Sequence, residues 1–408
     1  MRNNLLLFLI GIFLFSACRK EDTSWNSDWV APIVNDTLAL NNLVNDSTIS
    51  TGTGMYYQVD LSRTIFDFGI EDIVTVIDTT IDQTFTIAVS SINVPPGYSF
   101  VNEIEEHDFN VKDVQLKKVR VSQGKINIKV YNPLTTKAFF TVQLPGIYKN
   151  GILFEEQYEV EAGSIANPGT VTANLDISGY DIDLTGSSGS DYNKIQSRLL
   201  VNSDPAGSSI TITNNHIFKI EANFKDIKVD YARGYLGNMI FSDTSDYAIE
   251  LFNAVASGSI DLPSPLIQFD VVNGLKVDAK ATFTAVKNTN FSGNTVALSG
   301  SNIGTPFYLD PATGSWNTLS NSTESIIFNN VNSNVEAYLE NLGNMHSVGY
   351  KIELNPWGNT SGGWNEIFPT SRLKVKLKAQ MPLAIGADGL TLRDTFDFDV
   401  NRILKSRM

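Results

Sequence analysis

Cysteine is almost absent from this chain, because Cys18 is the only one in 408 residues. A single thiol cannot form a disulfide within the fold, so stability has to come from apolar burial and backbone hydrogen bonds. Histidine is nearly as scarce, with three residues and no pair at the spacing of a zinc site. Two of them, His216 before a predicted strand and His346 after a predicted helix, are expected to form local hydrogen bonds.

The first apolar run is too short to cross a bilayer. It extends over 5–15, follows the positive Arg2, and precedes the small residues Ser16 and Ala17. A mature membrane-spanning helix needs about 20 residues. The layout therefore predicts a secretory signal peptide over 1–17.

The end of this run gives the single cysteine a role. Phe-Ser-Ala-Cys over 15–18 resembles the lipobox of bacterial lipoproteins, with Phe15 where leucine is usual. The resemblance implies cleavage before Cys18, alkylation of its thiol by a diacylglyceryl group, a lipid anchor that includes palmitate, and a lipidated tether over 18–30. The alternative is an ordinary signal peptide with an incidental cysteine.

The charges after Cys18 point to a place in the cell. Lys20, Glu21 and Asp22 follow Arg19, and this order resembles the surface export signal of Bacteroidota lipoproteins. The resemblance implies an outer-membrane protein that is lipid-anchored and faces the cell exterior. The alternative is a tether that is merely solvated.

Positive charge is in deficit, with 30 Lys and Arg against 44 Asp and Glu and a net charge of −14. Such a chain repels nucleic acid, so no nucleic-acid partner is expected. Hydrophobic residues make up 42% of the chain and charged residues 18%, which favours a large core over global disorder.

Helical patterns are few and period-two alternation dominates. It is clear over 126–130, 218–224 and 373–379, where the last stretch is apolar on one face and all lysine on the other. One wet face is typical of antiparallel sheets. We predict a mainly β protein of antiparallel β-sandwich-like domains with two or three short helices, of which 333–343 and 247–255 are candidates.

Three strands are predicted to end in an asparagine that a breaker follows: Asn132, Asn273 and Asn355. The stretch around the first, about 114–164, resembles the LEA14/WHy type of β-sandwich. The Gly-Ser segment 185–191 is the best candidate linker, which predicts an N-terminal β domain over 31–184 and a C-terminal β domain with short helices over 192–408.

Catalytic motifs are missing: there is no Gly-x-Ser-x-Gly elbow and no phosphate-binding Walker loop. His107 lies in an acidic cluster, and metal ligation competes there with a solvated turn. Asp176, Asp181 and Asp183 surround a turn, and calcium binding competes with hydrogen bonding within that turn. We expect no enzyme activity, no catalytic residues, no cofactor and no metal.

Two tryptophans in the polar loop 355–367 are the candidate ligand-binding residues. Trp357 and Trp364 stand among Gly358, Gly362 and Gly363. Exposed indole rings stack on sugars or anchor protein partners. The alternative is that the rings fold back into the core.

Three short motifs, over 36–38, 46–48 and 78–80, resemble the sites at which Bacteroidota attach O-glycans, which implies Thr37, Ser47 and Thr79 as acceptors. For the whole chain we expect a non-enzymatic binding or assembly module for a glycan or a protein complex of the outer membrane. The alternatives are a carrier of lipid or another apolar ligand in a β-rich tunnel and a glycan hydrolase.

Overall fold

The computed structural model describes residues 49–51, 57–249, 252, 255–382 and 386–392, which all belong to one unit, Val44–Met408. The predicted signal peptide, the tether with Cys18, and the export residues Lys20, Glu21 and Asp22 lie outside the described residues, as do Thr37 and Ser47. Neither described helix has the length and apolarity that crossing a membrane requires.

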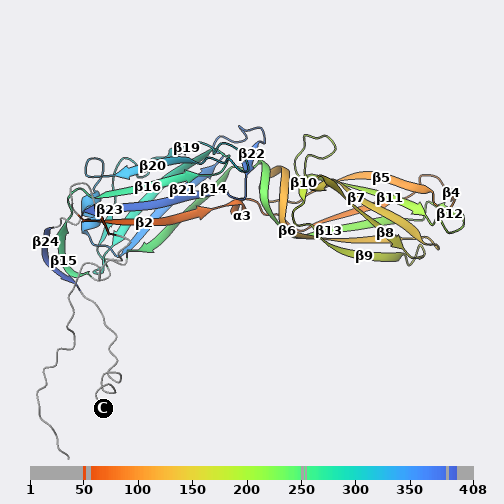
Figure 1. Cartoon of the computed structure of the whole chain (residues 1–408), viewed down its shortest axis with the longest axis horizontal. Helices are drawn as coiled ribbons and strands as arrows, with labels where there is room; N and C mark the ends of the chain where they lie inside the picture. The colour runs from red at the N-terminus through yellow and green to blue at the C-terminus, as the bar shows by residue number, and fades with distance from the viewer. Residues whose placement is uncertain (1–48, 52–56, 250–251, 253–254, 383–385, 393–408) are drawn as a thin grey trace, which may run out of the picture. The chain divides into compact units, whose positions relative to one another are not determined.

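Strands make up most of the described chain (Figure 1). The two helices are α3 (Ile70–Ile73) and α4 (Val335–Glu340). The strands are β1 (Ile49–Thr51), β2 (Tyr57–Phe68), β3 (Thr79–Phe85), β4 (Ser91–Val94), β5 (Ser99–Asp108), β6 (Gln115–Asn132), β7 (Ala138–Lys149), β8 (Ile152–Val160), β9 (Gly169–Asp176), β10 (Asp181–Asp183), β11 (Lys194–Ser203), β12 (Ile210–Thr213), β13 (Phe218–Tyr235), β14 (Met239–Ala248), β15 (Val255–Asp261), β16 (Leu266–Asn273), β17 (Ala279–Thr289), β18 (Thr295–Ala297), β19 (Phe307–Leu309), β20 (Ser322–Phe328), β21 (Met345–Leu354), β22 (Asn365–Ile367), β23 (Leu373–Pro382) and β24 (Gly386–Leu392).

The predicted fold class is confirmed, because the strands pair antiparallel and pack as sandwiches. One sandwich joins the sheet β1-β2-β23-β16-β20 to the sheet β14-β21-β17-β18. Aromatic rings meet between its layers: the ring centroids of Phe66 and Tyr350 are 5.0 Å apart, and those of Phe269 and Phe283 are 4.5 Å apart. Face-to-face packing of this kind buries the apolar side of each sheet.

The alternation read in the sequence over 373–379 forms β23. Its leucine and valine side chains are buried, and its lysines point outward beside acidic residues of the neighbouring strands. Lys378 Nζ lies 2.7 Å from Asp270 Oδ2, and Lys374 Nζ lies 3.3 Å from Asp67 Oδ2. Burial by itself would raise the pKa of Asp270, but hydrogen bonds led by that from Lys378 lower it to about 2. Two lysines of this row thus pair with carboxylates of the same sheet.

The second sandwich is one ten-stranded sheet that folds back on itself. The short strand β10 pairs with both β6 and β7, so it joins the layer of β3, β13, β6 and β9 to the layer of β8, β7, β11 and β5. Rings from the two layers meet inside, where the Phe140 and Phe218 centroids are 6.4 Å apart.

Strands that precede the segment 185–191, the candidate linker, pair with strands that follow it. Strand β11, on its far side, pairs with β5 and β7, while β2 pairs with β23. The segment itself is closed by hydrogen bonds, including one from Asp191 N to Thr185 O at 3.1 Å.

The helix predicted over 333–343 is confirmed as α4, which is shorter and has Asn334 as its N-cap residue. The helix predicted over 247–255 is wrong at both ends. Tyr247 and Ala248 finish β14, where they pair with His346 and Met345 of β21, and Val255 begins β15. Tertiary pairing there overrides the local pattern.

All three asparagines predicted to end strands are buried and bond to backbone. Asn132 Oδ1 accepts from Leu134 N and Asn273 Oδ1 accepts from Leu275 N, each at 3.0 Å. Their Nδ2 groups donate to carbonyls further along the chain. Asn355 Nδ2 donates to Gly237 O at 2.8 Å. The asparagines therefore replace backbone partners that the strands lose at their ends.

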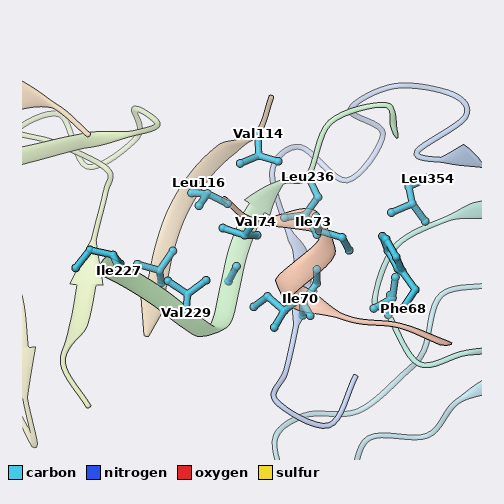
Figure 2. Close-up of a cluster of buried hydrophobic side chains, with 14 of the residues drawn as sticks. Phe68, Ile70, Ile73, Val74, Val114, Leu116, Ile227, Val229, Leu236 and Leu354 are labelled. Carbon is cyan, nitrogen blue, oxygen red and sulfur yellow. The ribbon is translucent and has the colours of Figure 1, made fainter. Parts of the chain in front are cut away.

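The short helix α3 carries the chain from β2 toward β3. Figure 2 shows Ile70 and Ile73 of this helix, and Val74 directly after it, beside Val229 of β13 and Leu116 of β6. These side chains are nearly or fully buried. The start of β6 and the second half of β13 thus pack against α3 through buried apolar side chains.

Candidate ligand-binding surface

Both tryptophans of the predicted binding loop are on the surface. Trp357 is 56% exposed and Trp364 is 59% exposed, so neither ring plugs the core. The two rings have different neighbours. Their contacts matter because exposure alone does not distinguish a binding surface from a solvated loop.

Trp357 stacks on an aromatic side chain from another strand. Its ring centroid lies 5.3 Å from that of Tyr308 in β19, with 29° between the planes. Tyr308 is itself 58% exposed. Offset stacking holds both rings with little loss of accessible surface, which gives a flat aromatic platform.

Trp364 lies among cations instead. The Arg233 Cζ atom is 4.8 Å and the Lys117 Nζ atom is 5.2 Å from the indole centroid. Lys117 Nζ also lies 5.1 Å from the ring centroid of Tyr192. These distances are within the range of cation–π attraction.

The loop that carries the two tryptophans is held by its own polar groups. Asn359 Oδ1 accepts from Gly363 N at 2.8 Å, and Ser361 Oγ accepts from Trp364 N at 3.2 Å. Gly363 has φ of 81°, and a Cβ atom there would stand 2.5 Å from Tyr192 Oη. Glycine is therefore required at 363, and the indole of the next residue is positioned before any ligand binds.

A β-bulge explains why Lys117 joins this group. In the pairing of β6 with β13, Lys118 lies opposite Arg233 and Leu116 opposite Gly234, so Lys117 is the extra residue. A bulge changes the direction of a side chain relative to regular alternation. Lys117 and Lys118 are both half-buried, whereas regular alternation would place them on opposite faces.

A second tryptophan cluster stands on the same two strands. The Arg120 Cζ atom lies 4.1 Å from the Trp316 ring centroid, and Trp316 stacks on Tyr231 with 4.8 Å between centroids. Arg120 donates from Nε and Nη2 to the two carboxylate oxygens of Asp230 at 2.9 and 3.0 Å. The hydrogen bond to Asp230 raises the pKa of Arg120. This arginine is therefore already paired.

Glu366 of β22 is fully engaged by neighbouring side chains. Its Oε1 accepts from Tyr231 Oη at 2.8 Å, and its Oε2 lies 2.5 Å from Lys276 Nζ. Desolvation, together with this hydrogen bond, raises the pKa of Tyr231. Both carboxylate oxygens thus have partners, although Glu366 stands opposite Arg233 in the strand register.

The remaining predicted residues have structural partners. His107 Nε2 lies 2.7 Å from Ser197 Oγ, which donates to Gln83 Oε1 at 2.8 Å. The histidine must then donate to the serine, and a serine in that state is not activated as a nucleophile. Desolvation lowers the pKa of His107. The second histidine, His216, lies in a turn with its Nδ1 atom 2.9 Å from Thr213 Oγ1.

The three aspartates considered for calcium are spread over local contacts. Asp176 Oδ1 accepts from Ser178 N at 2.9 Å, and Asp183 Oδ1 accepts from Thr185 N at 2.9 Å. Asp181 pairs with Lys118 Nζ at 3.2 Å. The bonds of Asp176 and Asp183 are the turn bonds that the alternative interpretation predicted, whereas Asp181 makes an ion pair between β10 and β6.

Thr79, implied as an O-glycan acceptor, is only 2% exposed. Its hydroxyl donates to Ile77 O at 3.0 Å and accepts from Asn110 N at 3.2 Å. That assignment is wrong for the folded chain, because the oxygen is buried and already bonded.

Two groupings were not predicted from sequence. Asp261, Glu336 and Glu340 bring carboxylate oxygens within 4.8 Å of one another, and exposed acidic groups gather in this way without an ion. An open cleft of about 400 Å³ runs beside α3, with Ile70, Val74 and other apolar side chains in its wall. Its wall also carries Glu71, Lys228 and Asp230, so the cleft is of mixed polarity.

No protein-family model matches this chain, and comparison with curated proteins gives no match. A solved structure described as a "putative secreted protein" from Parabacteroides distasonis ATCC 8503 is similar at 12% identity, over 86% of this chain and 98% of that one, with a TM-score of 0.21. A solved N-glycanase F is similar at 10% identity, over 73% of this chain and 99% of that one, with a TM-score of 0.19. Scores this low carry no argument about fold or function.

Proposed function

We propose that this chain is an outer-membrane lipoprotein, anchored through Cys18 and displayed to the cell exterior, that binds a glycan without catalysing a reaction. The observation that carries the binding part is that two exposed indoles are held in place, Trp357 by stacking on Tyr308 and Trp364 by the hydrogen bonds of its own loop. Sugar rings present C–H groups that pack on indole faces, and rigid aromatic side chains lose little entropy on binding.

Local support for a binding role comes from the neighbours of the two rings. A tryptophan that is more than half exposed leaves apolar surface in water, which is unfavourable unless a partner covers it. Stacking on Tyr308, which is itself exposed, holds Trp357 at the surface. The anchor and its surface export rest on the sequence resemblance of 15–22.

The binding role is tested with the full lipoprotein in detergent on a glycan array. We expect Trp357→Ala and Trp364→Ala each to weaken the retained glycan at least about tenfold, as truncation of an aromatic anchor does. Tyr98→Ala is the matched control, because Tyr98 is an aromatic residue 63% exposed in the turn before β5. Binding that is unchanged in both tryptophan variants would contradict the proposal, and capture of a protein instead of a glycan would redirect it.

A further inference from the structure

Two cations beside Trp364 have no acidic partner. The Lys117 ammonium and the Arg233 guanidinium both approach the indole, yet no carboxylate oxygen of the described residues lies within 4.0 Å of either one. Their neighbours behave differently: Lys118 pairs with Asp181, Arg120 with Asp230, and Lys276 with Glu366. In a protein with net charge −14, two cations at one ring without a carboxylate partner are unexpected, and the acceptor that Lys117 Nζ does have is a backbone oxygen, Gly362 O at 3.5 Å.

The strand register gives Arg233 no free carboxylate. Arg233 stands directly opposite Lys118 in the pairing of β13 with β6, and Lys118 is already paired with Asp181. The bulge at Lys117 brings in a further positive charge rather than a negative one. The nearest carboxylate by register, Glu366, has both oxygens committed to Tyr231 and Lys276.

The Arg233 side chain also has an unused donor. Its Nε atom is buried and has no hydrogen-bond partner among the described residues. Buried polar groups in native proteins almost always have partners, and an exception calls for a ligand or a water. Because this Nε atom has almost no accessible surface, a ligand would reach the guanidinium through its terminal Nη groups, which suit the oxygens of a carboxylate or sulfate.

We propose that Trp364, Arg233 and Lys117 form a subsite for an acidic sugar, that is, a pyranose that carries a carboxylate or a sulfate. The ring packs on the exposed indole, and the anionic substituent accepts hydrogen bonds from Arg233 and Lys117. This inference rests on the proposed glycan binding and names its ligand class. The aromatic pair Trp357 and Tyr308 has no cation near its rings among the described contacts. It would bind a neutral sugar of the same glycan.

The test uses a glycan array whose members come in matched sets: neutral, uronic-acid-containing and sulfated forms of the same backbone. We expect the wild-type lipoprotein to retain an acidic member over its neutral counterpart. Lys117→Gln and Arg233→Gln should each weaken that acidic member at least about tenfold and leave the neutral one unchanged, because a charge-assisted bond is lost. Affinity for the acidic member should also fall with added salt.

Lys129→Gln is the matched control. Lys129 lies in the same strand with its Nζ atom 4.7 Å from the Tyr131 ring centroid, and the substitution removes the same charge. Arg233→Lys keeps the charge but loses the planar fork, and it should bind more weakly than wild type. Thermal unfolding of every variant shows whether the sheet is intact, and an Arg233 variant that unfolds leaves Lys117→Gln to decide.

The outcomes separate the two proposals. If Trp364→Ala abolishes binding while both cation variants bind normally, the acidic subsite is overturned and glycan binding stands. If wild type retains no acidic member over its neutral counterpart, the acidic subsite is likewise overturned. Inorganic sulfate that competes as well as the sulfated glycan would show a simple anion site and overturn the role of the sugar ring.

Discussion

At the scale of single residues, His346 is held neutral inside the fold. Tyr338 Oη lies 2.8 Å from its Nδ1 and Gly343 O lies 2.8 Å from its Nε2, so the carbonyl fixes the proton on Nε2. Desolvation lowers the pKa of His346 to about 4, well below the ordinary value of a histidine, 6.5. The sequence predicted a local hydrogen-bonding role, and that prediction is confirmed.

This histidine should make stability fall with acidification. Because the unfolded state binds the proton first, the contribution is fully present above pH 6.5 and is lost as pH falls toward 4. The slope approaches about 1.4 kcal/mol per pH unit, and the total is roughly 3 kcal/mol.

The measurement is urea unfolding of wild type and His346→Gln at pH 7, 6 and 5. We expect the difference in unfolding free energy between the two proteins to change by about 2 kcal/mol over this range, with wild type losing more. His107, whose pKa is lowered in the same direction, is present in both proteins and cancels. A difference that stays constant with pH would show that His346 is not the titrating group.

At the scale of strands and turns, the buried asparagines are the strongest local determinants. Asn273 lies at the end of β16 with no exposed surface, and it satisfies Leu275 N, Val277 O and Asp310 O. Asn273→Ala should lower the unfolding free energy by about 3 kcal/mol, since each orphaned buried group costs roughly 1–3 kcal/mol. Chemical denaturation measures this.

The control for that substitution is Asn174→Ala. Asn174 is exposed in β9, and its Oδ1 accepts from Asn127 Nδ2 at 2.6 Å. Its loss should change stability by no more than about 0.5 kcal/mol. Equal effects of the two substitutions would mean that the buried turn has no special role.

Elements with a strong local pattern could be predicted from sequence. Alternation gave β6, β13 and β23, and an Asn followed by a breaker marked three strand ends. The short helix α3 could not be found, because four residues carry no periodicity. The helix prediction for 247–255 was wrong because the first residues of this segment pair with β21. Pairing between distant strands cannot be predicted from the local sequence.

Only the local part of the candidate site, its two tryptophans, could be predicted from the sequence. Trp357 and Trp364 stand out because a glycine-rich loop cannot bury two indoles by itself. Lys117, Arg233 and Tyr192 reach the loop only through a bulge and through pairing across more than 100 residues. Trp316 is placed on Tyr231 in the same long-range way.

At the scale of the whole molecule, the sheets explain how the chain can be stable without a disulfide. Apolar side chains from both sandwiches form a buried cluster, and fully buried phenylalanines lie in both, among them Phe140, Phe218 and Phe269. A folded body of this kind can present a fixed loop, but it reaches a ligand in the medium only if it is held outside the cell. The anchor is therefore the central claim of the account.

Metabolic labelling of whole cells with a palmitate analogue, followed by protease treatment of the intact cells, tests that claim most directly. We expect the wild-type chain to carry the label and to be cleaved by external protease, and Cys18→Ser to remain unlabelled and to leave the outer membrane. A wild-type chain without label, or a Cys18→Ser chain that matures and localises normally, would contradict the account.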